Sequence, residues 1–160
     1  MTATAADVTD KIRALLSEHG VPFREVEHAP TFTSEESARA RSEPLEIGAK
    51  ALVMKAGSDF AVFVLPADRK IDSAAVRRHL AINALRFATP EELFALTGLV
   101  PGSVPPFGHP ILPMPLFADV GVGAAQDRIA FNAGLLTCSF VLSASDWRRV
   151  ARPQVLALAR

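Results

Sequence analysis

The sequence predicts an α+β domain built around a mixed, largely antiparallel sheet. Helical patterns occur at both ends and between groups of strands, and two segments, 49–65 and 128–142, have the form of β-hairpins. The regular strand-helix alternation of a doubly wound sheet is not present. With 160 residues, of which 49% are hydrophobic and 21% charged, the chain is long enough for one core and short for two. We therefore predict one domain over residues 1–160.

The N-terminal part predicts a helix, a strand and a second helix. Apolar residues recur at helical spacing over residues 7–19, and residues 23–28 alternate as in a strand. Thr33 followed by Glu36 has the form of a capping box, which satisfies two backbone donors at a helix start. This second helix is expected to end before Pro44.

The central part predicts the first hairpin and two more helices. The segments 49–55 and 60–65 are short, apolar and rich in β-forming residues, and a turn-forming tetrapeptide separates them. Residues 71–85 have a helical pattern. Another helix begins after Thr89, which is followed by a proline and two glutamates, and ends at Gly98.

The C-terminal part predicts a proline-rich loop, a second hairpin and a last helix. Six of the twelve prolines lie in residues 101–115, which excludes a helix and favours an ordered loop plus an edge strand. The hairpin over 128–142 is expected to turn at residues 132–134. Ser145 or the aspartate after it would cap the last helix, interrupted or restarted at Pro153.

The composition limits the classes of function. The 17 Lys+Arg residues balance 17 Asp+Glu, which argues against a protein that holds long nucleic acids through a general positive field. A single cysteine cannot form an intramolecular disulfide, and the histidines show no metal-ligand spacing, so we expect no metal and no cofactor. Without a leader pattern or an apolar run of about 18 residues, we expect a cytoplasmic protein with no membrane partner.

Lys50 is the most informative ionisable residue. In a strand of period two it shares a face with Leu52 and Met54, whereas Lys55 lies on the other face. One interpretation is structural, with the alkyl stem covering apolar neighbours and the ammonium in water. The other is a cation at the mouth of an apolar pocket, offering a point charge to a phosphate or carboxylate.

Other segments also allow two interpretations. The loop from Gly102 to Gly108 could bring its backbone close to a ligand, or simply turn the chain. Residues 132–134 suit an ordinary hairpin turn, and Cys138 suits a small core residue better than a nucleophile. The basic groups 77–79 and 148–149 are typical of solvated helix faces, although either could contact an RNA backbone.

Taken in order, four motifs carry a resemblance to a known family. They are Val26-Glu-His-Ala-Pro-Thr-Phe-Thr33, Lys50-Ala-Leu-Val, Gly102-Ser-Val-Pro-Pro-Phe-Gly108 and Asn132-Ala-Gly134. The corresponding family patterns include Lys-Thr-Leu-Val and a Gly-x-Val-Ser/Thr-Pro-hydrophobic-Gly loop. From about residue 28 to 147 the chain resembles the aminoacyl-tRNA deacylases represented by YbaK, the free-standing ProX-type proteins and the editing domain inserted in bacterial prolyl-tRNA synthetases.

The resemblance implies a compact α+β fold with a barrel-like sheet, and hydrolysis of the ester between a wrong amino acid and the 3′-terminal ribose of a tRNA. It assigns the catalytic role to Lys50, whose ammonium would orient the terminal adenosine and favour the developing oxyanion. Water would be activated by the substrate's own ribose hydroxyl or by backbone groups. The residues it implies for substrate binding are Thr31, Gly102, Pro106, Gly108, Asn132 and Gly134.

Two departures from the family pattern bear on the substrate. Pro105 stands where the family has Ser or Thr. Asn132 and Ala133 stand where the family often has a pair of small residues, Ser and Gly, before the turn glycine. The first expectation is a small amino acid, cysteine or alanine, on tRNA(Pro), bound through its 3′-terminal adenosine and acceptor stem, with prolyl-tRNA synthetase as a second candidate partner. The alternatives are a non-catalytic module that binds an acceptor stem or a synthetase, and a small-molecule pocket unrelated to tRNA.

Overall fold

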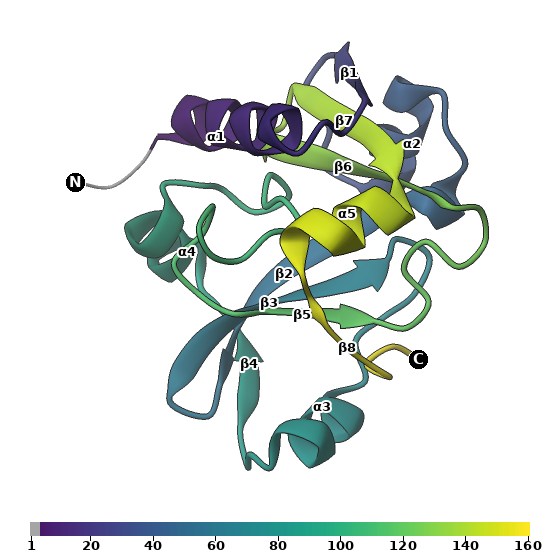
Figure 1. Ribbon diagram of the computed structural model, residues 1–160. Coiled ribbons are helices and arrows are strands. Elements are labelled where there is room, and N and C mark those ends of the chain that lie inside the picture. The colour runs from purple at the N-terminus through teal and green to yellow at the C-terminus, as the bar shows by residue number, and fades with distance from the viewer. Residues whose placement is uncertain (1–3) are drawn as a thin grey trace.

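The computed structural model describes residues 4–160, so the first three residues of the N-terminal stretch lie outside the described part. Five α-helices and one 3-10 turn lie among eight strands (Figure 1). The helices are α1 (Ala5–Glu18), α2 (Ser34–Arg41), α3 (Ser73–Leu80), α4 (Pro90–Thr97) and α5 (Ala144–Ala151), and the 3-10 turn is η1 (Leu45–Ile47). The strands are β1 (Phe23–Glu27), β2 (Ala49–Ala56), β3 (Asp59–Pro66), β4 (Leu85–Phe87), β5 (Leu116–Asp119), β6 (Arg128–Leu135), β7 (Cys138–Ser143) and β8 (Gln154–Leu156).

The strands form two sheets. The smaller sheet is antiparallel, in the order β1-β7-β6, and α1 packs on it at the top of Figure 1. The larger sheet, in the order β4-β2-β3-β5-β8, is mixed, because β5 runs parallel to both β3 and β8. An isolated parallel bridge between Gly48 and Ala130 joins them. The α+β class is confirmed, but the barrel-like sheet needs correction, since one bridge does not close the two sheets into a barrel.

The main core lies between the two sheets. Its largest fully buried side chains include Trp147, Phe107, Phe131 and Phe140, which come from α5, the proline-rich loop and the small sheet. The Phe131 ring contacts the rings of Phe107 and Phe140 edge-on, with centroids 5.8 and 6.0 Å apart. Cys138 is buried in the same cluster, and burial raises the pKa of its thiol to about 11, which suits a core residue.

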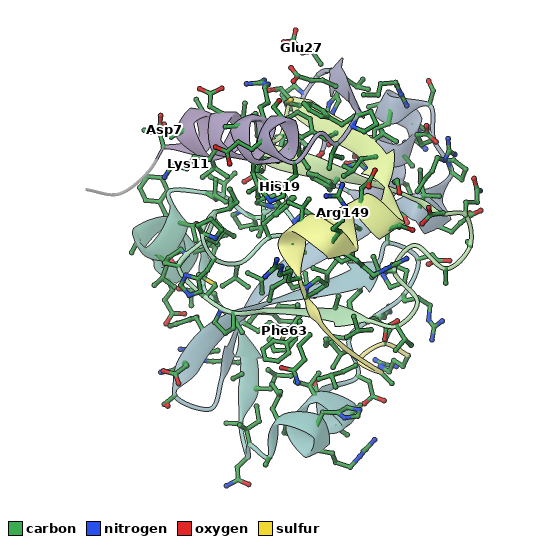
Figure 2. The ribbon with its side chains drawn as sticks, in the orientation of Figure 1. Asp7, Lys11, His19, Glu27, Phe63 and Arg149 are labelled. Carbon is green, nitrogen blue, oxygen red and sulfur yellow. The ribbon has the colours of Figure 1, made fainter. Side chains whose placement is uncertain are left out.

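A second core covers the other face of the large sheet. Phe63, labelled in Figure 2, is fully buried there and stacks on Phe117 with ring centroids 5.3 Å apart. Its neighbours Val62 and Val64 on β3 belong to the main core. Because alternate residues of β3 face two different cores, this strand is an almost unbroken apolar run.

The first hairpin and the helix starts at Thr33 and Thr89 are confirmed, but the Glu36 carboxylate accepts from the Phe32 N–H, so the full capping box expected at Thr33 does not form. Strands β2 and β3 pair in register from Ala49 opposite Pro66 to Ala56 opposite Asp59. Thr89 forms the expected capping box with Glu92. The helix predicted over 71–85 is shorter, because Ala81 adopts a left-handed conformation and the chain then forms β4, which the sequence pattern did not predict.

Three expectations in the C-terminal half were wrong. The second hairpin turns at residues 136–137, and Asn132 to Gly134 lie inside β6, with an irregular register between Asn132 and Leu135. Strand β5 is not an edge strand, since it lies between β3 and β8. The last helix is capped by Ser143, and β8 follows it in place of a restarted helix.

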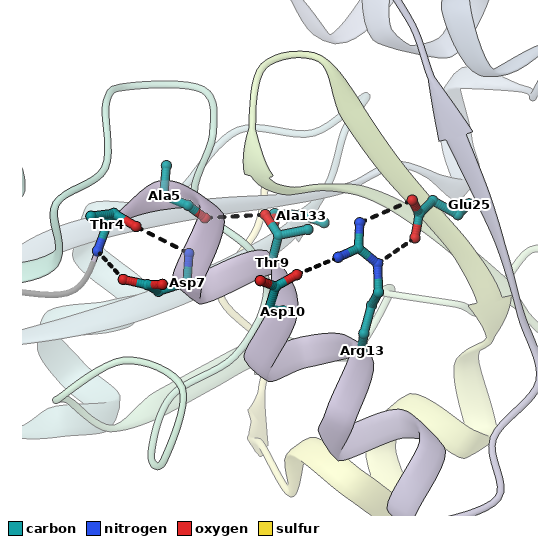
Figure 3. Close-up of polar contacts among 8 residues, drawn as sticks. All are labelled: Thr4, Ala5, Asp7, Thr9, Asp10, Arg13, Glu25 and Ala133. Carbon is teal, nitrogen blue, oxygen red and sulfur yellow. Dashed lines mark hydrogen bonds and ion pairs between the residues drawn. The ribbon is translucent and has the colours of Figure 1, made fainter.

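Helix α1 is tied to the irregular part of β6, as Figure 3 shows. The Thr9 Oγ1 hydroxyl donates a 2.6 Å hydrogen bond to the Ala133 carbonyl, and the Arg13 guanidinium forms a bidentate pair with Glu25 on β1. Gly134 has φ +93°, and a Cβ there would lie 3.1 Å from the Ala5 carbonyl oxygen. A glycine at this position therefore allows the helix to approach the strand and fix its course.

Candidate active site

A cavity of about 200 Å³ lies where α2 and the loop before it face the first residues of β2. Four of the seven residues expected at the site line it: Thr31, Lys50, Gly102 and Asn132. The other lining residues are Phe32, Thr33, Ser34, Ser37, Ala38, Arg41, Leu45, Gly48, Ala49, Ala51, Leu52 and Ala67. The lining therefore combines two cationic side chains with hydroxyl groups and small apolar residues.

Lys50 reaches the cavity from the start of β2. Its Nζ donates a 2.7 Å hydrogen bond to the Arg69 carbonyl oxygen, and its other N–H bonds remain for a ligand. The side chain is half-buried, and this burial lowers the pKa of the ammonium, while the negative charges of Glu35 and Asp68 partly oppose the shift. The ammonium is thus a partly desolvated point charge fixed at the cavity.

The lowered pKa of Lys50 can be measured directly. We expect the Lys50 side chain to titrate below 10.5, the ordinary value, because burial disfavours the charged form. Between this lowered pKa and 10.5, the Lys50 side chain holds more protons in the unfolded chain than in the folded chain. The free energy of unfolding therefore rises with pH over this range. Carbon-13 labelling of the four lysines and an NMR pH titration would test this, with the Lys50→Ala variant assigning the signal. A Lys50 midpoint at or above 10.5 would contradict the expected shift.

A buried guanidinium forms the polar floor of the cavity. Arg41, at the end of α2, is only 6% exposed, and its Nε donates to Ser139 Oγ at 2.8 Å and its Nη2 to Asn132 Oδ1 at 3.1 Å. Its Nη1 atom, for which the described residues supply no hydrogen-bond partner, is not fully enclosed. Because Arg41 lines the cavity, this N–H group is a candidate donor to a ligand there.

Arg41 keeps its charge without a carboxylate in contact. Among residues 4–160 it forms no ion pair, because the nearby Glu43 pairs with Arg24 and Arg128 instead. Burial lowers the pKa of Arg41 to about 10, so it remains protonated near neutral pH. A buried charge without a partner is costly, which makes this position a candidate for binding an electron-rich group of a ligand.

Asn132 and Thr31 are held in fixed orientations. The Asn132 Oδ1 also accepts from Ser139 Oγ at 3.1 Å, and its Nδ2 donates to the Gly102 carbonyl at 2.8 Å. The Thr31 hydroxyl lies 2.7 Å from Ser37 Oγ. Arg41, Ser139, Asn132 and the Gly102 carbonyl therefore form one connected hydrogen-bond network that joins α2, β6, β7 and the loop at Gly102, and the Thr31–Ser37 pair is separate from it.

The other three expected residues lie away from the cavity. The Pro106 carbonyl accepts a 2.8 Å hydrogen bond from the indole of the buried Trp147. Gly108 lies against the Met114 carbonyl, which would be 2.6 Å from a Cβ, and Gly134 packs under α1. All three hold the backbone of the loop and of β6 in place without lining the cavity.

Arg41 was missed by sequence reasoning, since an arginine near the end of a short helix is normally solvated. The available signal was its spacing from Ser37 and Ala38, which places all three on one helix face.

Comparison with known proteins identifies the fold. Residues 28–150 match the family described as the aminoacyl-tRNA editing domain. The chain belongs to this family. The expected resemblance and the expected enzyme class, an aminoacyl-tRNA editing hydrolase, are thereby confirmed.

Relatives and solved structures agree with this membership. The chain is 36% identical, over 94% of its length and 92% of the relative, to the multifunctional Ser/Thr-tRNA deacylase ProXp-y of Escherichia coli (strain K12). It is also 30% identical, over 101 residues, to the proline--tRNA ligase of Shouchella clausii (strain KSM-K16). That match covers 63% of this chain and 17% of the ligase. A solved structure described as a candidate trans-editing enzyme for prolyl tRNA synthetase superposes with a TM-score of 0.82 at 25% identity, covering 96% of this chain and 97% of that one.

Within the described residues, no group of three or more histidine, cysteine, aspartate or glutamate side chains is arranged to hold a metal ion. No helix in that part of the chain has the length and apolar character needed to cross a membrane.

Proposed function

We propose that this editing domain, spanning residues 1–160, is a trans-acting deacylase that removes a small amino acid from the 3′-terminal ribose of a mischarged tRNA in the cytoplasm. The observation that supports this most is the placement of Lys50 and Arg41 on one cavity of about 200 Å³. This volume is below the range of about 300–1,000 Å³ for pockets that enclose drug-sized ligands. It suits a small aminoacyl group, with the nucleotide left outside.

In this proposal Lys50 positions the ester and stabilises the charge that develops on it. The ammonium, fixed by the Arg69 carbonyl, directs its other N–H bonds at a phosphate, a ribose oxygen or the oxyanion of the tetrahedral intermediate. Attack by water, assisted by the ribose hydroxyl of the substrate, then breaks the bond between the acyl carbon and the ribose oxygen. Positioning accounts for much of the acceleration.

The polar floor favours serine and threonine over the cysteine and alanine expected from the sequence. Arg41, Thr31 and Ser37 all line the cavity, so a side-chain hydroxyl of the substrate has polar groups to pair with there. A site built to bind a hydroxyl rejects an analogue that lacks it far more strongly than an apolar pocket distinguishes one methyl group. The name of the Escherichia coli relative, a Ser/Thr-tRNA deacylase, supports the same choice.

The proposed macromolecular partner is a mischarged tRNA, contacted through its 3′-terminal adenosine and the adjoining acceptor stem. The match to a proline--tRNA ligase and to a solved trans-editing candidate supports prolyl-tRNA synthetase as a second partner and tRNA(Pro) as one carrier. The balanced charge of the chain fits such a short contact, because few phosphates need to be neutralised.

A panel of aminoacyl-tRNAs tests the substrate directly. We expect seryl and threonyl esters to be released at least about tenfold faster than alanyl esters on the same tRNA, because only the hydroxyl bonds to the floor. Release of radiolabelled amino acid, corrected for spontaneous hydrolysis, is the measurement. Faster release of cysteine or alanine would overturn the proposed selectivity. Tight tRNA binding with no release from any ester would instead support a non-catalytic binding module.

A further inference from the structure

Phe32 is an aromatic side chain that lines the mouth of the cavity yet remains 74% exposed. Among the exposed large apolar side chains of the described residues, Phe32 has the largest exposed fraction. An apolar ring left in water does not contribute the free energy that its burial would provide, so the Phe32 ring adds little to the stability of the fold. An exposed ring at the entrance to a substrate cavity points to contact with the substrate.

The backbone on both sides of the ring is tied down. The Thr31 N–H donates to the Leu136 carbonyl at 3.2 Å, and the Phe32 N–H donates to Glu36 Oε2 at 3.2 Å. Thr33 then caps α2 by accepting from the Glu36 N–H. The ring is therefore presented from a fixed backbone, which reduces the entropy lost when a partner packs on it.

We propose that Phe32 is a stacking platform for the nucleobase of the terminal nucleotide whose aminoacyl group occupies the cavity. This inference rests on the proposed deacylase function. The cavity is too small to enclose a nucleoside together with its amino acid, so the base lies at the rim. An aromatic face there binds it through π-stacking. With a net charge of zero, the chain lacks a general field to hold the tRNA end, and stacking supplies affinity independent of charge.

The Phe32→Ala variant tests the platform, with Phe94→Ala as the matched control. Phe94 is 59% exposed on α4 and does not line the cavity. Removal of one stacking ring is expected to lower kcat/KM on a mischarged tRNA by about 5- to 150-fold, mainly through KM. The Phe94→Ala variant should match the wild type. Phe32→Trp should retain activity, whereas Phe32→Leu, apolar but without a π-face, should resemble Phe32→Ala.

A fluorescence measurement separates binding from catalysis. Deacylated tRNA whose terminal adenine is replaced by 2-aminopurine should lose fluorescence on binding the wild type and keep it with Phe32→Ala, because stacking quenches this base. Equal kcat/KM for the Phe32→Ala and Phe94→Ala variants, full activity of Phe32→Leu, or unchanged quenching without the ring would each overturn the platform. Absence of amino-acid release by the wild type would overturn the deacylase function alone, since the quenching experiment still tests the platform.

Discussion

Replacement of Lys50 by alanine is expected to lower kcat/KM for release of the amino acid by at least about 100-fold, the effect typical of losing one charge-stabilising donor in an ester-cleaving site. The ammonium is the group on the cavity that combines a full charge with unused N–H bonds at the point where β2 begins. Its half-buried position means that water screens this charge less than it would a charge on the open surface. Single-turnover rates on a mischarged tRNA measure the effect.

Lys55→Ala provides the matched control. Lys55 lies on the same strand, but its ammonium is placed over the Phe60 ring at 5.9 Å from the centroid, and it does not line the cavity. It should keep wild-type rates. A Lys50→Ala variant as active as Lys55→Ala would contradict the role assigned to Lys50, and an equal loss in both would attribute the effect to net charge.

Arg41→Met is expected to reduce kcat/KM for a seryl ester by about 100-fold while changing the free energy of unfolding by less than about 2 kcal/mol. The substitution removes two hydrogen bonds, yet it also removes the desolvation cost of a buried charge. Ser139 keeps His28 as a partner and Asn132 keeps Gly102, so neither is left unpaired. Methionine fills much of the volume that the arginine occupied.

The comparison of rates with urea denaturation decides what Arg41 does. Arg39→Met, at an exposed position of the same helix, should leave both quantities unchanged. Unfolding of the Arg41→Met variant, or a loss of more than about 4 kcal/mol, would show that the guanidinium serves the fold. Wild-type selectivity for serine in a stable Arg41→Met variant would remove Arg41 from the substrate site.

The elements with strong local signals could be predicted from the sequence. Strands β2 and β3 alternate around a clear turn, and Thr89 begins α4 with a complete capping box. The turn at residues 132–134 could not be excluded in the same way, because asparagine and glycine are ordinary turn residues. What keeps Gly134 inside β6 is the close approach of α1, a tertiary contact that leaves no local pattern.

The site was predictable only in part, for a related reason. Lys50 could be found because its motif resembles that of a known family. Arg41 could not, since its burial depends on Ser139 and Asn132 arriving from two strands far away in the chain. Gly108 and Pro106 match the same family pattern, but they hold the loop in place and do not line the cavity. A linear motif does not distinguish residues that stabilise a loop from residues that contact a ligand.

The bridge between Gly48 and Ala130 has a consequence for how the substrate range of this fold can change. Gly48 lines the cavity, so the cavity lies at the seam where the two sheets meet through one pair of residues. The width of the cavity then depends on how the two sheets pack against their shared core, which includes Phe131 and Phe107. Substitutions deep in that core can widen or narrow the seam. Related chains can therefore diverge in the amino acid they accept while every side chain on the cavity wall stays the same.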